Sequence, residues 1–165
     1  MEQLCIFESD VHEGVSKWKL YLDGASRNNP GPAGAGIVLY KNNELVQEGG
    51  YYLGLKTNNQ AEYMALLIGL FELKKIMKPN DQLLIISDSQ LMVRQLQGMY
   101  KVKNPELKKC FSLAKYLLKD VPCNIKHVLR HENKQADAMA NRGVDTKNEV
   151  PEAFVQLLKK HAIAW

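Results

Sequence analysis

Two aspartates in this chain of 165 residues follow apolar runs that are typical of buried strands. Asp23 closes a run that begins at Trp18, and Asp88 ends a run that begins at Leu83. If these strands are parallel neighbours, both carboxylates lie at one edge of the sheet and repel each other, which raises a pKa unless a cation binds. Hard oxygen ligands favour Mg²⁺ or Mn²⁺. The sequence therefore predicts a divalent metal site at this edge.

Two more acidic residues are expected near the starts of helices. Glu62 falls in the first turn of a helix predicted over residues 59–77, and Asp137 follows a helix start at Asn133 or Lys134. An acid in this position often only interacts with the helix dipole, and that explanation stays open for both. Alanines on both sides of Asp137 would let its helix approach the sheet closely and bring its carboxylate towards the others.

Hydrophobic periodicity defines the elements that must position these four acids. The expected strands span residues 18–22, 35–40, 45–53, 83–86 and 124–129. The expected helices span residues 59–77, 89–97, 106–118, 133–141 and 151–163. Short connections join the first three strands into an antiparallel meander, and helical crossovers make the other two parallel. The predicted fold class is α/β, with a five-stranded mixed sheet flanked by helices on both faces.

Four segments resemble, in order, the motifs of the type 1 ribonuclease H family. They are residues 21–26 with 29–36, residues 57–63, residues 85–89 and residues 133–137. The resemblance covers about residues 17–145 and implies a ribonuclease H-like fold. It also implies an endonuclease that hydrolyses the RNA strand of RNA–DNA hybrids and leaves 5′-phosphate and 3′-hydroxyl ends.

The resemblance further implies two-metal catalysis with Mg²⁺, for which Mn²⁺ can substitute. In this family scheme Asp23 would bridge both ions. Glu62 and Asp88 would complete the ion on the leaving-group side, and Asp137 would complete the ion that activates water.

A histidine on the loop before the last aspartate often assists catalysis in this family. Here the loop is short, and His131 is the candidate, by the usual acid–base chemistry of histidine. A solvated loop histidine is the alternative, and Arg130 or Glu132 could fill part of the role. His127 lies within a predicted strand and is expected to be structural.

Amide side chains can recognise the 2′-hydroxyls of RNA because they both donate and accept hydrogen bonds. Asn29, Asn58 and Asn59 match the family positions for this task. Turn formation before a proline is the alternative for Asn29, and helix capping is the alternative for Asn58. A DNA phosphate pocket maps onto Thr57 and Asn104.

The segment between residues 97 and 105 is too short for the long basic projection of some family members. Lys101 and Lys103, with Lys108 and Lys109, could form a smaller basic patch that binds nucleic acid in a salt-sensitive way. A solvated lysine face is the alternative.

Composition limits the number of domains and the class of protein. An apolar fraction of 45% suits one domain with a core, and a net charge of +4 permits a polyanionic partner. The three cysteines are unclustered, and no apolar run is long enough for a membrane span or a signal peptide. We therefore expect a cytoplasmic enzyme that acts as a monomer without an obligate protein partner.

The expected organisation is an N-terminal extension over residues 1–16, a catalytic domain over residues 17–146 and a C-terminal helical extension over residues 147–165. The last helix is expected to pack on the domain, with partner binding as the alternative. Two other functions stay open: a nuclease of the same fold that acts on double-stranded RNA or DNA, and a non-cleaving nucleic-acid-binding module.

Overall fold

The computed structural model describes residues 14–165, so the N-terminal extension lies almost entirely outside the described residues. The strands are β1 (Lys17–Ser26), β2 (Gly31–Lys41), β3 (Glu44–Lys56), β4 (Gln82–Ser87) and β5 (Cys123–His127). The helices are α2 (Asn58–Lys74), α3 (Gln90–Leu96), α4 (Pro105–Leu117), α5 (Lys134–Thr146) and α6 (Glu152–Lys160), and a 3₁₀ turn, η1, spans Arg130–Glu132.

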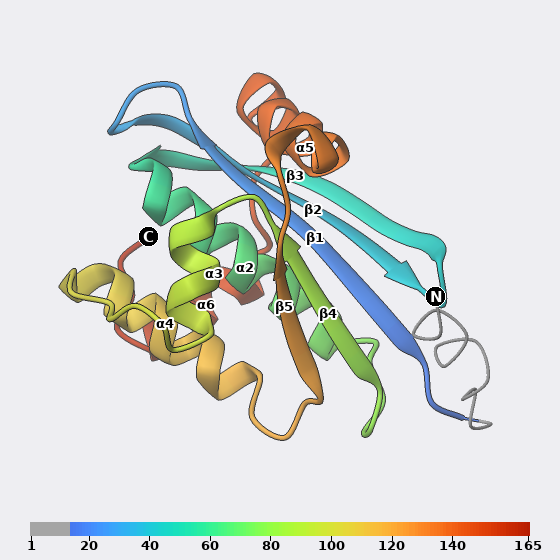
Figure 1. Ribbon diagram of the computed structural model, residues 1–165. Coiled ribbons are helices and arrows are strands. Elements are labelled where there is room, and N and C mark those ends of the chain that lie inside the picture. Colours follow the sequence, from blue (N-terminus) through green and yellow to red (C-terminus); the bar gives the residue numbers. More distant parts are fainter. Residues whose placement is uncertain (1–13) are drawn as a thin grey trace.

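The five strands form one mixed sheet in the order β3-β2-β1-β4-β5. β1, β2 and β3 pair antiparallel, whereas β4 lies parallel to β1, and β5 lies parallel to β4 (Figure 1). The predicted meander with two parallel strands is therefore confirmed. Because β4 lies next to β1, the carboxyl ends of these two strands meet at the same edge of the sheet.

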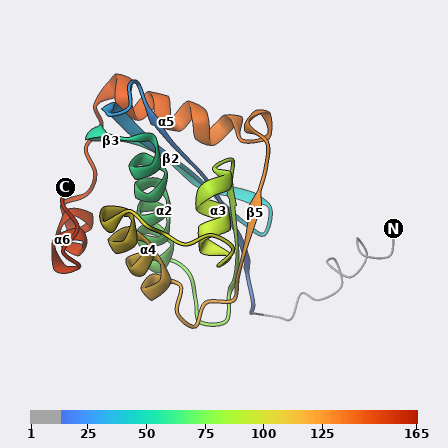
Figure 2. The ribbon, with the colours of Figure 1, turned by 60° about the vertical axis from the view of Figure 1, so that its left-hand side comes forward.

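Helices cover both faces of the sheet, as predicted. α5 lies on one face against β2 and β3, and α2, α3 and α4 lie on the other, with α2 packed on β1 (Figure 2). α2 is buried on most of its circumference, between the sheet and α4. An α-helix in this position needs apolar residues all round, which explains its weak amphipathic pattern.

The C-terminal helix packs on the domain. Phe154 and Leu158 of α6 are fully buried in the main core, and the Phe154 ring contacts the Phe71 ring of α2 edge to face at a centroid distance of 5.6 Å. The His161 ring lies 5.3 Å from the Tyr116 ring of α4. None of the helices in the described part of the chain is long and apolar enough to cross a membrane.

Several predicted element ends were wrong. β1 continues to Ser26 because it stays paired with β2 as far as the Ser26–Ala33 pair. α2 begins at Asn58 and ends at Lys74, and α5 continues to Thr146 instead of ending at residue 141. Asp23 therefore lies inside its strand rather than at the strand end, and only Asp88 follows a strand directly.

Candidate active site

Three of the four predicted acids come together at the end of the sheet where β4 stops beside β1. One carboxylate oxygen from each of Asp23, Glu62 and Asp88 lies within 4.8 Å of the other two. Strand register explains the first pair, because Leu22 of β1 pairs with Ser87 of β4 and the next residue of each chain segment is an aspartate. The cluster forms although Asp23 is only 5% exposed.

Glu62 reaches the cluster because α2 passes unusually close to β1. A Cβ atom on Gly24 would lie 2.2 Å from the backbone carbon of Ala61, so only glycine allows this approach. The Gly24 N–H then donates a hydrogen bond of 3.1 Å to Glu62 Oε2. Thr57 is the N-cap, so Glu62 lies in the second turn of α2, and its predicted place in the first turn was wrong. The helix dipole is therefore not the main reason for this acid.

Asp137 approaches from the opposite face of the sheet, on the first turn of α5. The Asn133 side chain fixes the start of this helix, because its Nδ2 donates a buried hydrogen bond of 2.9 Å to the Leu22 carbonyl oxygen. A Cβ atom on Gly36 would lie 2.1 Å from the Ala136 carbonyl oxygen, so this glycine lets α5 lie directly on the sheet. Asp137 thereby reaches Asp23 but lies outside the three-residue cluster.

The electrostatics of the cluster favour a bound cation. Burial, the Asp88 charge and the nearby Asp137 carboxyl together raise the pKa of Asp23 to about 8. Burial and the charges of Asp23 and Asp88 also raise the pKa of Glu62 well above its ordinary value, against the opposing effect of the Gly24 N–H. Positive charge bound between the carboxyls would offset both shifts.

The donor set fits a divalent metal ion. It consists of carboxylate oxygens, which hard cations such as Mg²⁺ and Mn²⁺ prefer. Asp137 Oδ1 is buried and has no hydrogen-bond partner among the described residues. The Arg130 guanidinium lies 3.8 Å from the same oxygen, too far for a hydrogen bond, and the Arg130 side chain is 83% exposed. The carboxylates therefore have coordination capacity that the described protein groups do not use.

His131 lies on η1, the 3₁₀ turn that directly precedes Asn133 and α5. It is exposed, and so is His127 at the end of β5. Glu132 Oε1 accepts a long hydrogen bond of 3.4 Å from the Leu129 N–H and closes the turn. The structure thus places His131 on the segment that leads into the carboxylate cluster, and its catalytic role stays a prediction.

The predicted RNA-contacting amides form a linked group beside the site. Asn29 Oδ1 accepts a hydrogen bond of 3.0 Å from the Asn58 N–H, and Asn58 Oδ1 accepts one of 3.1 Å from the Ser26 N–H. The capping explanation for Asn58 is wrong, because Thr57 forms the capping box with Gln60. Asn29 also lies in the bend between β1 and β2, where the turn-forming alternative places it.

The other predicted substrate contacts lie on exposed turns and helix starts. Asn59 is exposed in the first turn of α2. Asn104 caps α4 by accepting hydrogen bonds from the N–H groups of Glu106 and Leu107, at 2.9 and 3.1 Å. Lys101 and Lys103 are exposed on the segment that precedes it. Contact of these residues with a substrate stays a prediction.

Sequence reasoning missed three residues that position the acids: Asn133, Gly24 and Gly36. The sequence pattern indicates Asn133 only as a helix start, although this residue ties α5 to β1. All three lie in segments that match the family motifs, and this was the one signal that pointed to them. Their roles depend on contacts between elements, so local periodicity alone could not find them.

Comparisons with known proteins agree with this geometry. A family model described as reverse transcriptase-like matches residues 21–143. The ribonuclease HI of Halobacterium salinarum is 42% identical over 127 residues, which cover 76% of this chain and 63% of that protein. The ribonuclease H of Coxiella burnetii is 34% identical over 142 residues, covering 76% of this chain and 88% of that protein.

Among solved structures, LC11-RNase H1 in complex with an RNA/DNA hybrid superposes with a TM-score of 0.73 at 35% identity. The match covers 78% of this chain and 97% of that one. The chain spans 63% of the length of the halobacterial relative, and only 34% of a mycobacterial relative that is 37% identical.

Proposed function

Because this chain belongs to the type 1 ribonuclease H family, we propose that it hydrolyses the RNA strand of RNA–DNA hybrids and leaves 5′-phosphate and 3′-hydroxyl ends. The observation that carries the proposal is the cluster of Asp23, Glu62 and Asp88, with Asp137 beside it. The likeness to LC11-RNase H1, solved with an RNA/DNA hybrid, supports the same substrate class.

The family uses divalent metal ions, and we propose Mg²⁺, with Mn²⁺ as a substitute, at the four carboxylates. When bound, the ions supply an activated water and stabilise charge on the scissile phosphate. Asp23 interacts with all three other carboxyls, since Glu62 and Asp88 join it in the cluster and Asp137 acts on it from α5. It is therefore the residue we expect to serve both metal positions.

Recognition of the hybrid is assigned to the amides next to the cluster. The hydrogen bonds of Asn29 and Asn58 described above use their amide oxygens, which leaves both NH₂ groups available as donors to 2′-hydroxyls. The exposed Asn59 lies beside them. We assign the DNA phosphate to the N-terminal turns capped by Thr57 and Asn104, where helix N–H groups favour anions.

His131 is proposed to assist proton transfer or product release. It lies on η1, six residues before Asp137, and its exposed side chain can turn towards a bound phosphate. Histidine suits this task because its ordinary pKa lies near neutrality.

The proposal is tested by cleavage of a labelled RNA–DNA hybrid with wild type and Asp88→Asn, in Mg²⁺, Mn²⁺ or EDTA. We expect metal-dependent cleavage of the RNA strand only, and a loss of about 1000-fold or more in the variant, equivalent to about 4 kcal/mol of barrier. Asp145→Asn is the matched control, because Asp145 is exposed and pairs with Arg27 away from the cluster.

Double-stranded RNA and double-stranded DNA are assayed in parallel. Faster cleavage of either duplex than of the hybrid would favour a nuclease of the same fold with another substrate. Hybrid binding by a folded wild type that cleaves nothing in either metal would favour a non-cleaving binding module.

A further inference from the structure

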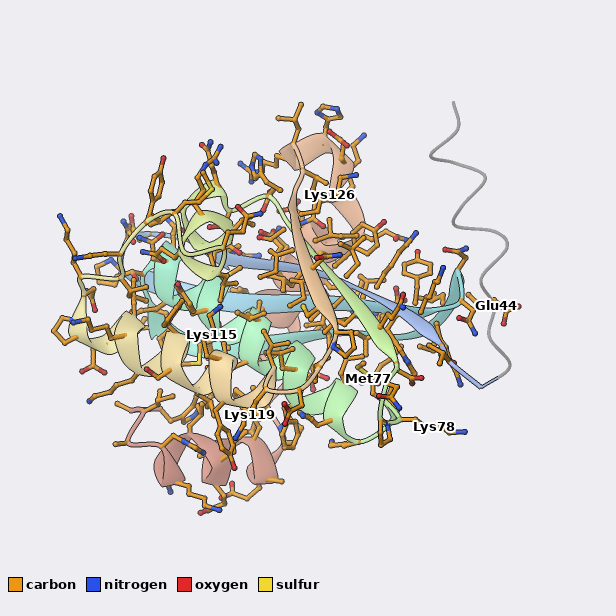
Figure 3. The ribbon with its side chains drawn as sticks, turned by 60° about the horizontal axis from the view of Figure 1, so that its bottom comes forward. Glu44, Met77, Lys78, Lys115, Lys119 and Lys126 are labelled. Atoms are coloured by element: carbon orange, nitrogen blue, oxygen red, sulfur yellow. The ribbon has the colours of Figure 1, made fainter. Side chains whose placement is uncertain are left out.

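A concave surface lies at the end of the sheet remote from the carboxylates. This basal groove, of about 350 Å³, lies between the C-terminal ends of α2 and α4 and the start of β4. Leu73, Met77, Leu117, Leu118 and Val121 supply its apolar lining. Lys74, Lys78 and Lys119 also line it, beside Asp120 and the buried Asp81, so the cations outnumber the carboxylates by one. Figure 3 shows Met77, Lys78 and Lys119 on this side of the molecule. The proposed catalytic chemistry uses none of these residues.

The chain enters the fold at the edge of this groove. The Ser16 N–H donates a hydrogen bond of 2.9 Å to Asp81 Oδ1, and the Ser16 carbonyl accepts one of 2.9 Å from the Gln82 N–H. Asp81 lines the basal groove and also accepts hydrogen bonds from Trp18 Nε1 and the Lys78 N–H. The residues before Ser16 are thus tethered directly beside the apolar lining.

The sequence of residues 1–13 complements the groove. Residues 4–7 form a run of four apolar residues, Leu-Cys-Ile-Phe, and Glu8, Asp10 and Glu13 follow it. Gly14 lies seven positions after Phe7, and an extended chain of this length spans about 23–25 Å. The apolar run can therefore reach the lining, and the acidic residues between run and tether can reach the three lysines.

We infer that the basal groove binds the chain's own N-terminal segment, with residues 4–7 on the apolar lining and the following acids near Lys74, Lys78 and Lys119. Exposed ion pairs contribute little by themselves, so apolar contact supplies most of the binding and the charges set its direction. A tethered segment acts at an effective concentration near millimolar, which favours it over a second copy of the chain. The inference is independent of the proposed function.

The native Cys5 lies within the apolar run and allows a direct test in the full-length chain. Met77→Cys places a thiol in the groove, and Glu44→Cys places one outside it as the matched control. Glu44 is exposed at the hairpin beside the chain entry, where the Asn42 N–H donates a hydrogen bond to the Lys17 carbonyl. Both variants carry Cys123→Ser, because Cys123 adjoins the groove residue Pro122, whereas Cys110 is only 3% exposed and is retained.

Disulfide formation with Cys5 is followed at micromolar protein in oxidised glutathione, by mass spectrometry under non-reducing conditions. We expect the Met77→Cys protein to cross-link within one chain at least about tenfold faster than the Glu44→Cys protein, because docking raises the local concentration of Cys5. Lys78→Cys, at an exposed position, repeats the test if Met77→Cys perturbs the fold. Ile6→Asp should remove the difference, whereas Val11→Asp should preserve it.

Equal cross-linking rates for the groove and control thiols would overturn the inference, since a free tether reaches both. Faster formation of intermolecular than of intramolecular disulfides would also overturn the inference, because the groove would then bind a second copy of the chain.

Discussion

At the scale of single residues, the candidate active site is distinguished by negative charge at buried positions. Asp23 is 5% exposed, and its pKa is raised to about 8 by burial, by Asp88 and by Asp137. Sequence reasoning singled out four acids from apolar runs, helix starts and family motifs, and the structure brings three of them, Asp23, Glu62 and Asp88, into one cluster. Sequence reasoning could not identify the degree of burial, which arises from the approach of α2 and α5 to the two faces of β1.

The raised pKa of Asp23 predicts how the stability of the metal-free protein depends on pH. Between about pH 4 and pH 8 the folded protein holds a proton that the unfolded chain releases, so the free energy of unfolding falls as pH rises through this window. Asp23→Asn removes this loss. In EDTA we expect the variant to exceed wild type by a few kcal/mol at pH 8 and to match it near pH 4, since one pKa unit corresponds to about 1.4 kcal/mol.

Urea unfolding in EDTA at both pH values measures this difference, and Asp145→Asn controls for removal of an exposed carboxylate. Mg²⁺ should narrow the difference by stabilising wild type, by about 2.7 kcal/mol at a hundred times the dissociation constant. A wild type as stable as Asp23→Asn at pH 8 without metal would show that charge repulsion in the cluster is small.

The two histidines near the site allow a matched comparison. If His131 assists proton transfer, His131→Ala should lower kcat about 100-fold and change KM little, in line with typical contributions of general acid–base catalysis. His127→Ala should leave kcat within about twofold, because His127 lies on β5 rather than on the turn before α5. Steady-state kinetics on the hybrid decide between them, and equal effects of both variants would contradict a specific role for His131.

At the scale of elements, periodicity predicted each strand and α-helix found between residues 14 and 165 but placed several ends wrongly. α5 was expected to stop at residue 141, yet it continues through Gly143, where a Cβ atom would lie 2.4 Å from the Tyr51 backbone nitrogen. This glycine serves contact with β3 instead of ending the helix. The length of β1 was likewise underestimated because pairing with β2 extends it through residues of low strand propensity. Such tertiary effects are invisible to local patterns.

The position of α5 yields a prediction that separates stability from activity. Asn133→Ala removes the hydrogen bond to the Leu22 carbonyl and leaves that buried oxygen without its partner, which should cost about 1–3 kcal/mol. Since Asn133 lies one turn before Asp137, the hybrid cleavage rate should also fall at least about tenfold, as expected when the support of a metal ligand is removed.

Asn148→Ala is the control for this prediction. Asn148 Nδ2 donates a hydrogen bond of 2.8 Å to the Gly50 carbonyl just after the other end of α5. Its removal should lower stability and leave cleavage by the folded protein nearly unchanged. Urea unfolding and single-turnover cleavage measure the two effects, and an equal reduction of activity in both variants would show that general loosening of α5 is responsible.

At the scale of the whole molecule, the two ends of the sheet differ in the side chains that they bring together. The acid cluster of Asp23, Glu62 and Asp88 lies where β4 ends beside β1, and the basal groove lies at the opposite end of the sheet, beside the chain entry. The acid cluster could be predicted from the sequence because acidic side chains that directly follow apolar runs are uncommon. The groove was not predicted, because its apolar and lysine side chains are common residue types and form a concave surface only where α2 and α4 end.

The distribution of charge over the molecule gives a last prediction. A net charge of +4 is small, so we expect affinity for a nucleic acid to come from local clusters of basic residues. Lys101 and Lys103 would contribute to this affinity by neutralising phosphates of the hybrid. The double variant Lys101→Glu/Lys103→Glu should then weaken hybrid binding and reduce the slope of log K against log salt by about 0.7–0.9 for each phosphate that is no longer neutralised. Affinity and salt dependence are both measured by titration in the Asp88→Asn background, which is expected to prevent cleavage.

Lys159→Glu/Lys160→Glu on α6 is the control, because it changes the net charge equally at exposed positions. It should leave the slope unchanged. An equal weakening in both double variants would mean that the hybrid senses overall charge rather than a patch beside Asn104.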